Sequence, residues 1–131
     1  MQPKFVHLRF HSEYSITDGI VRLNPAIKQM KEWGVGAFGQ TDLMNMFGSV
    51  RFYESCHKEG IKPILGCDLW ITNEEDPAHP FRLTVYCMDH DGYHSLCVLL
   101  TRRGDKGAYR YFRRSRGRDP DTFPPGKNCR G

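Results

Sequence analysis

The chain has 131 residues, of which 39% are hydrophobic and 26% charged, a composition that suits one compact domain and leaves little room for a second. No run of about 18 apolar residues occurs, which excludes a membrane-spanning helix, and the N-terminus leads into no apolar signal stretch. Five widely spaced cysteines without a C-x-x-C pair argue against a disulfide framework and favour a reducing compartment. We therefore expect a soluble, cytoplasmic protein with no membrane partner.

The formal net charge of +4 is distributed unevenly along the chain. Residues 1–100 hold 9 Lys and Arg against 12 Asp and Glu, whereas residues 101–131 hold 10 against 3. The segment from residue 102 onward also lacks Leu, Ile, Val and Met, so it cannot supply a core face. We predict an N-terminal domain over residues 1–101 and a basic tail rich in Arg, Gly and Pro over residues 102–131.

Three interpretations of this tail stay open. It is a disordered segment, because its composition cannot offset the entropy lost on ordering. Alternatively, it is a nucleic-acid-binding arm in which Tyr109, Tyr111 and Phe112 stack on bases among the arginines. The third interpretation is a shifted reading frame or truncation that replaced the proper continuation.

The apolar pattern before the tail predicts alternating strands and helices. The clearest helix starts at Asn24-Pro25, a capping residue and a proline suited to the first turn, and runs up to Gly34. In chain order we predict a strand at 5–8, the helix from 24, a strand at 36–40, a helix at 49–58, strands at 61–65, 69–72 and 81–87, and a helix at 93–101. Strands separated by helix-length connections favour an α/β fold with a parallel sheet, open or closed into a barrel.

Polar side chains follow three of the predicted strands. His11 and Asp18 come after the first strand, Asp42 after the second and Asp68 after the third. Because the carboxyl ends of parallel strands meet at one edge of a sheet, we expect these four side chains, the polar rim, to lie together. Imidazole and carboxylate groups are ligands for a divalent ion such as zinc or manganese, although each residue alone is more typical of a capped loop or a turn.

Three motifs together resemble the PHP domain that begins the alpha subunit of bacterial DNA polymerase III. They are H-S-E-Y-S-x-x-D-G from His11, T-D-x-x-N-M-F-G from Thr41, and G-I-K-P-I-L-G-C-D ending at Asp68. The resemblance covers approximately residues 4–100 and implies a truncated, N-terminal part of that domain. The implied fold is about the first half of a distorted β/α barrel, whose strand ends hold metal ions for phosphoester hydrolysis in the family.

The sequence departs from the family's metal-binding pattern at two positions. Arg9 stands at the first histidine of H-x-H, and Leu43 stands at the histidine of T-D-H. Arginine offers no lone pair and carries a permanent positive charge, so it cannot ligate a metal ion. We expect no cofactor, at most weak zinc or manganese binding at a vestigial polar rim, and pairing of Arg9 with Asp42 or Asp68.

The resemblance implies a part in DNA replication within a DNA-directed DNA polymerase, a nucleotidyltransferase. The implied partners are the remainder of the alpha subunit, the proofreading exonuclease subunit and, through the holoenzyme, DNA. The aspartates that catalyse polymerisation in the family lie far downstream, so we expect a scaffold and partner-docking module with no catalytic residue. The alternative is an active metal-dependent PHP phosphoesterase related to histidinol-phosphatase, and a third hypothesis, resting on the tail alone, is a small basic nucleic-acid binder.

Overall fold

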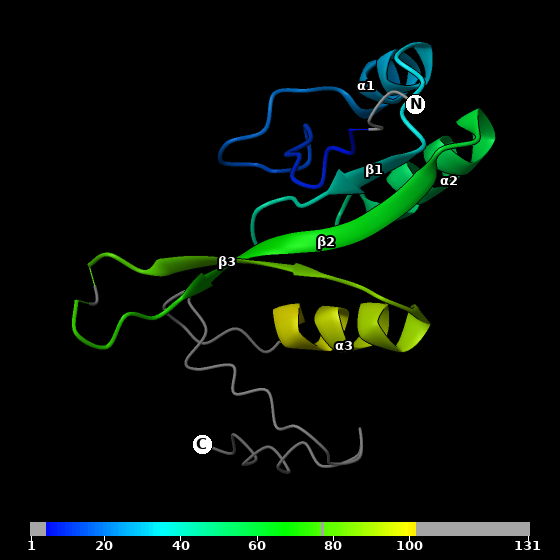
Figure 1. The fold of residues 1–131 in the computed structure, drawn as a ribbon. Helices are drawn as coiled ribbons and strands as arrows, with labels where there is room; N and C mark the ends of the chain where they lie inside the picture. Colours follow the sequence, from blue (N-terminus) through cyan, green and yellow to red (C-terminus); the bar gives the residue numbers. More distant parts are fainter. Residues whose placement is uncertain (1–4, 77, 102–131) are drawn as a thin grey trace.

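The computed structural model describes residues 5–76 and 78–101, and the predicted basic tail lies outside the described residues. The elements are α1 (Leu23–Glu32), β1 (Ala37–Gln40), α2 (Ser49–Glu59), β2 (Lys62–Ile71), β3 (Phe81–Tyr86) and α3 (His90–Thr101) (Figure 1). The three strands form one open sheet in the order β1-β2-β3. The α/β class is thereby confirmed, whereas closure into a barrel stays a prediction. Within the described residues, no helix is long and apolar enough to cross a bilayer.

β2 is one long strand where the sequence predicts two, at 61–65 and 69–72. Its first half pairs in parallel with β1 and its second half pairs antiparallel with β3, so that Asp68 lies within the strand opposite Thr84. Gly66 stands where the two pairings meet, and a Cβ at this position would lie 2.6 Å from the backbone oxygen of Val85. The predicted break between residues 65 and 69 is wrong because β2 exchanges one neighbour for the other and keeps its backbone groups paired. The predicted parallel sheet is wrong for β3, which returns through a connection too short for a parallel crossover.

The predicted first strand at 5–8 is reduced to a single parallel bridge between His7 and Phe38. The segment still runs beside β1, since the backbone N–H of Gly39 donates to the carbonyl of His7 at 2.8 Å. A Cβ on Gly39 would lie 2.3 Å from the carbonyl oxygen of Leu8, so only glycine permits this close approach. The chain that follows Leu8 is therefore held against the carboxyl end of β1.

Two small apolar cores lie on one face of β2. The first core joins α1, β1 and α2, and its buried members are Leu23, Ile27, Met30, Phe38, Phe52, Cys56 and Ile61. The second core joins β2 to α3, and its buried members are Cys67, Leu69 and Leu96. Leu65 packs on the first core, while Cys67 and Leu69 belong to the second. Because alternate residues of a strand share a face, α2 and α3 cover the same face of β2, near its two ends (Figure 1). Asp68 and Trp70 project from the opposite face.

The helix ends follow the sequence signals in part. α2 ends where predicted, with Gly60 in the left-handed conformation (φ 74°). The N-cap of α1 is Arg22 rather than Asn24, whose side chain instead accepts a hydrogen bond from Ser55 of α2 at 3.2 Å. α3 begins at His90, ahead of the predicted start. The predicted cap is wrong because the Asn24 side chain links α1 to α2 and does not accept a hydrogen bond from the backbone N–H groups in the first turn of α1.

Candidate functional site

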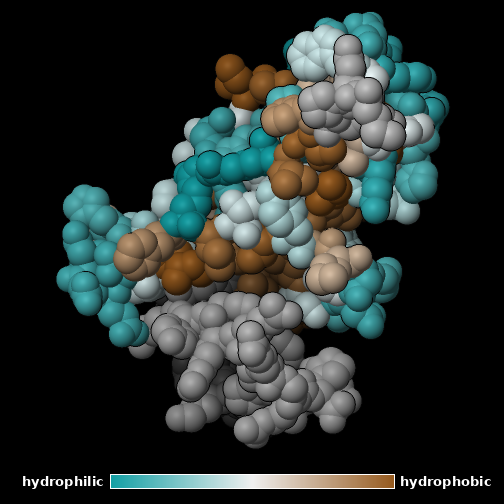
Figure 2. Space-filling view, in the orientation of Figure 1, coloured by the Kyte–Doolittle hydropathy of each residue, from teal (hydrophilic) through white to brown (hydrophobic). Residues whose placement is uncertain are grey.

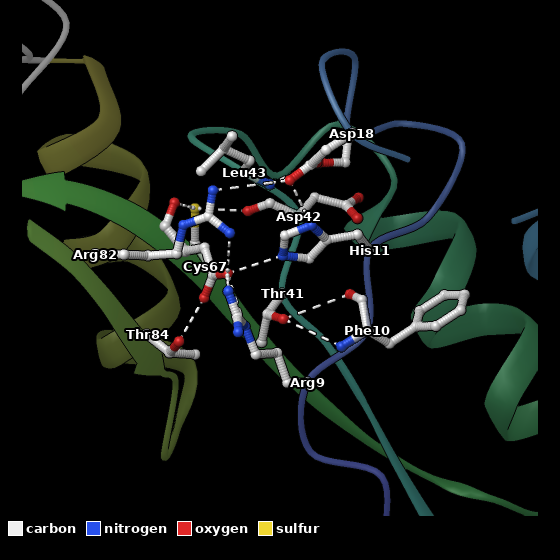
Figure 3. Close-up of polar contacts among 12 residues, drawn as sticks. Arg9, Phe10, His11, Asp18, Thr41, Asp42, Leu43, Cys67, Arg82 and Thr84 are labelled. Atoms are coloured by element: carbon white, nitrogen blue, oxygen red, sulfur yellow. Dashed lines mark hydrogen bonds and ion pairs between the residues drawn. The ribbon is translucent and has the colours of Figure 1, made fainter. Parts of the chain in front are cut away.

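Asp68 is the centre of a polar cluster that also contains Arg9, His11, Arg82 and Thr84, whose side chains Figure 3 labels. Its side chain is fully buried, and Arg9 donates to Oδ2 twice, from Nε at 3.0 Å and from Nη2 at 2.7 Å. His11 Nε2 lies 2.8 Å from the same oxygen, and the Thr84 hydroxyl donates to Oδ1. Burial raises the pKa of Asp68, but the hydrogen bonds from Thr84, Arg9 and His11 and the charge of Arg9 outweigh it and leave the pKa below its ordinary value. The ionised carboxylate is thus neutralised by the protein itself.

The β2–β3 register explains why these groups meet. Asp68 pairs with Thr84 and Trp70 pairs with Arg82, so these residues project from the same face of the two strands. The Arg82 guanidinium stacks on the Trp70 ring, 4.5 Å from the ring centroid. Its Nη1 and Nη2 atoms lie 3.9 Å from Asp68 and 3.9 Å from Asp18, respectively, which is beyond hydrogen-bond distance. The sequence pattern alone did not single out Arg82 and Thr84, because the alternation in β3 becomes informative only once its antiparallel partner is known.

His11 bridges two carboxylates across the cluster. Its Nδ1 lies 2.9 Å from Asp18 Oδ2 and its Nε2 lies 2.8 Å from Asp68 Oδ2, with 15% of its side chain exposed. Ser15 donates to the other oxygen of Asp18 at 2.5 Å, which fixes the orientation of that carboxylate. Both ring nitrogens of His11 therefore face carboxylate oxygens within the protein.

Asp42 lies at the same end of the sheet, but its carboxylate accepts hydrogen bonds from Ser12 and Gln40 and not from the residues around Asp68. Its carbonyl accepts from the N–H of Asp68 at 3.1 Å. Its buried carboxylate accepts from the Ser12 N–H at 2.6 Å, from the Ser12 hydroxyl at 2.7 Å and from Gln40 Nε2 at 2.7 Å. Burial raises its pKa, and the hydrogen bonds from Ser12 and Gln40 only partly offset that effect. Leu43, next to it, is also buried and forms a backbone bridge with Asp68.

The donor set in the cluster does not fit a metal ion. Across residues 5–76 and 78–101, no group of three or more His, Cys, Asp or Glu side chains stands where it could hold one. The carboxylate of Asp68 already accepts from Arg9, and the nitrogens of His11 are engaged. Zinc binds to nitrogen, sulfur and oxygen atoms that offer lone pairs, whereas the guanidinium brings a fixed positive charge to a ligand position. Arg9 and the Asp68 carboxylate form an ion pair within the protein at this position.

The chain is similar to proteins of known family. The profile of the PHP domain family matches residues 7–122. Relatives named DNA polymerase III subunit alpha are 45% identical over 100 residues in Neisseria meningitidis serogroup A, 41% over 102 residues in Pseudomonas fluorescens and 37% over 106 residues in Escherichia coli K12. These alignments cover 76%, 78% and 81% of this chain, and the chain spans 9% of the length of each relative.

A solved structure from Bifidobacterium adolescentis carries a name that provisionally describes it as a metal-dependent phosphoesterase. Its sequence is 15% identical to this chain, its TM-score is 0.48, and the match covers 62% of this chain and 26% of that one. A similarity at this level adds nothing to the assignment of fold or function. The resemblance that the three motifs predict is confirmed by the profile match, which covers most of the chain, and by the polymerase subunit relatives. The chain belongs to the PHP domain family.

Proposed function

We propose that this chain is the PHP part of a DNA polymerase III alpha subunit, in which it serves structure and partner docking rather than catalysis. The observation that carries the proposal is the pair between Arg9 and the buried Asp68, because a phosphoesterase of this family would use that end of the sheet for metal ions. The replication role is supported by relatives that are 37% to 45% identical and share that subunit name. Polymerisation and contact with DNA belong, on this proposal, to the longer protein.

The sheet of this chain is, on the same proposal, part of the distorted β/α barrel. Helices cover one face of β2 and polar groups line the other, as in a barrel with its helices outside. β3 has no second neighbour among the described strands, and its Phe81 and Leu83 side chains are 60% and 40% exposed. Apolar side chains also gather across the middle of the surface shown in Figure 2, with hydrophilic residues towards its ends. Such an edge is ordinarily covered by another strand or by a partner.

A groove between α2 and α3 supports the docking role. It has a volume of about 450 Å³, and aromatic and aliphatic side chains line it, among them Val50, Tyr53, Leu65, Met88 and Tyr93. Val50 is 62% exposed and Met88 is 96% exposed. Apolar patches bordered by polar residues are typical of protein interaction sites. The remainder of the alpha subunit and the proofreading exonuclease subunit are the partners proposed for these surfaces.

A phosphoesterase assay separates this proposal from the alternative enzyme. The 131-residue chain is incubated with a chromogenic phosphate monoester in the presence of manganese, beside the His11→Ala variant. We expect both proteins to release no more phosphate than buffer, because the cluster holds an arginine where water activation requires an open metal site. Manganese-dependent turnover that disappears in His11→Ala would instead establish the metal-dependent phosphoesterase.

A binding measurement tests the docking role. The chain and its Val50→Asp variant are each mixed with the exonuclease subunit, and co-elution is followed by size-exclusion chromatography. We expect the charged substitution to weaken co-elution, since it places a carboxylate in the apolar groove, while a Lys58→Asp control on the exposed surface of α2 retains it. Co-elution of both variants to the same extent as the unaltered chain would contradict docking at this groove.

A further inference from the structure

β3 (Phe81–Tyr86) is an edge strand of the described sheet, because it pairs with β2 on one side and has no further strand beside it within residues 5–76 and 78–101 (Figure 1). Its register with β2 runs through six consecutive residue pairs without a bulge. Strand edges are commonly protected from association by bulges, by proline or by lysine, and this strand contains none of these. The edge of β3 therefore keeps the regular geometry on which a second strand can pair.

The hydrogen-bond pattern identifies the backbone groups of β3 that point away from β2. In an antiparallel pair, every second residue exchanges hydrogen bonds with the residue opposite, and the residues between them direct their N–H and C=O groups to the other side of the strand. The N–H of Cys87 donates to the carbonyl of Leu65 at 2.8 Å, directly after the last register pair of the two strands. Counting back from Cys87, the odd-numbered residues of β3 bond to β2, whereas Arg82, Thr84 and Tyr86 direct their backbone groups to the open edge.

An apolar strip runs beside this edge. Phe81, Leu83 and Val85 alternate along one face of β3, the face on which α3 packs. Val85 packs against the second core, but Phe81 and Leu83 are 60% and 40% exposed, so α3 leaves part of the strip uncovered. A second strand would bury these apolar side chains and would also bond the backbone groups that no described residue pairs with.

We propose that the edge of β3 pairs with the same strand of a second copy of this chain, antiparallel and about a two-fold axis that passes beside Thr84. A two-fold axis perpendicular to the sheet keeps each side chain on its own face, so even-numbered residues of one copy lie opposite even-numbered residues of the other. The axis beside Thr84 sets this residue opposite Thr84 of the second copy and sets Arg82 opposite Tyr86 of the second copy. These are the three residues whose backbone groups point to the edge, so the two strands bond along their whole length.

The side chains that meet in this register complement one another. Arg82 stacks on Trp70 of its own chain, and the half-exposed ring of Tyr86 from the second copy lies on its other side. On the apolar face, Leu83 meets Val85 of the second copy, and the exposed part of the strip is removed from water. The strand is thus complementary to itself, which is the requirement for a symmetric interface between two copies.

Neighbouring registers are less favourable. An axis beside Arg82 would bring two arginine side chains directly opposite each other, and like charges in that position destabilise a strand pair. An axis beside Leu83 would set the backbone of Tyr86 opposite Pro80 of the second copy, which has no N–H to donate. The inference goes beyond the proposed function, because it concerns the association of this chain with itself and does not depend on the polar cluster. A second copy and a further strand of the longer protein would compete for the same edge.

Analytical ultracentrifugation of the 131-residue chain under reducing conditions tests the inference. We expect a reversible equilibrium between monomer and dimer with no larger species, because a two-fold interface uses the β3 edge of both copies and leaves neither for a third. Leu83→Lys places a charge in the apolar strip and should raise the dissociation constant of the dimer about 10-fold or more. Val21→Lys is the matched control, since Val21 is 43% exposed and lies outside β3, and it should leave the dissociation constant unchanged.

Hydrogen exchange of the backbone amides, followed by NMR, locates the interface without any substitution. The amides of Arg82, Thr84 and Tyr86 should exchange more slowly as the protein concentration rises, whereas those of Leu83 and Val85, bonded to β2 within each copy, should change far less. A monomer at every concentration would overturn the inference, even with slowly exchanging edge amides, because the same chain would then cover its own edge. A dimer whose edge amides keep their exchange rates, oligomers larger than dimers, or an equal loss of association in Leu83→Lys and Val21→Lys would also overturn it.

Discussion

Removal of the Arg9 side chain is the sharpest perturbation of the polar cluster. Arg9→Ala eliminates both hydrogen bonds to Asp68 Oδ2 and leaves the fully buried carboxylate with His11 and Thr84. Breaking a fully buried ion pair costs about 3–5 kcal/mol, whereas an exposed pair contributes about 0–1 kcal/mol. Because Arg9 is 52% exposed while its partner is fully buried, we expect a loss between these limits, about 2 kcal/mol of unfolding free energy at neutral pH.

The pH dependence of this loss identifies its cause. The pKa of Asp68 is lowered in the folded state, so its ionised form stabilises the fold above its ordinary pKa of about 4, and this contribution is lost as pH falls through the lowered value. Arg9→Ala raises the folded-state pKa, so the variant loses that contribution at a higher pH. The difference between the two proteins is therefore full at neutral pH, shrinks as pH falls through the higher pKa of the variant, and is smallest once Asp68 is protonated in both.

Urea unfolding followed by circular dichroism, at neutral pH and at about pH 3, measures this difference. Arg22→Ala, at an exposed arginine outside the cluster, is the matched control and should change stability by less than about 0.5 kcal/mol at either pH. An Arg9→Ala variant as stable as the unaltered chain at neutral pH, or one whose destabilisation persists unchanged in acid, would refute the argument that Arg9 compensates a buried charge.

Four further substitutions or treatments probe the rest of the fold. Asp42→Asn places an amide N–H₂ group next to the Ser12 and Gln40 donors whose hydrogen bonds the carboxylate accepts. It should lower the free energy of unfolding in urea by about 1–3 kcal/mol. Phe52→Ala empties part of the first core and should cost about 3–5 kcal/mol in the same assay. Gly60→Ala, at φ 74°, should cost about 1 kcal/mol. Burial raises the pKa of the Cys56 and Cys67 thiols to about 12, so both should react with iodoacetamide, as measured by mass spectrometry, only after unfolding.

The local elements were predictable because their signals are local. Gly60 ends α2 as its position after an apolar pattern indicates, and Asp42 comes just after β1 as predicted, whereas Asp68 lies within β2. His11, Asp18 and Asp68 come together, although the contact made by Asp18 runs through the imidazole. Asp42 shares their end of the sheet but serves Ser12, because a buried carboxylate takes the nearest backbone donors.

The long-range pairings were not predictable from the pattern alone. The alternation in β2 is the same whether the strand continues or stops at Gly66, since only its neighbours change there. Arg82 and Thr84 reach the cluster because β3 pairs antiparallel with register Asp68 opposite Thr84, a fact of tertiary structure that a single half-exposed strand does not encode. The position of Arg82 beside Asp68 can therefore be recognised only from the pairing of β2 with β3.

Metal content tests the central claim most directly, because that claim is that Arg9 has replaced an ion-binding group with a protein charge. The chain is incubated with excess zinc or manganese, dialysed and subjected to elemental analysis, beside a variant that carries both Arg9→His and Leu43→His. We predict far less than one equivalent of retained metal for the unaltered chain and a clear increase for the double variant, which regains two imidazole ligands. Near-stoichiometric metal in the unaltered chain that is lost in His11→Ala would contradict the account.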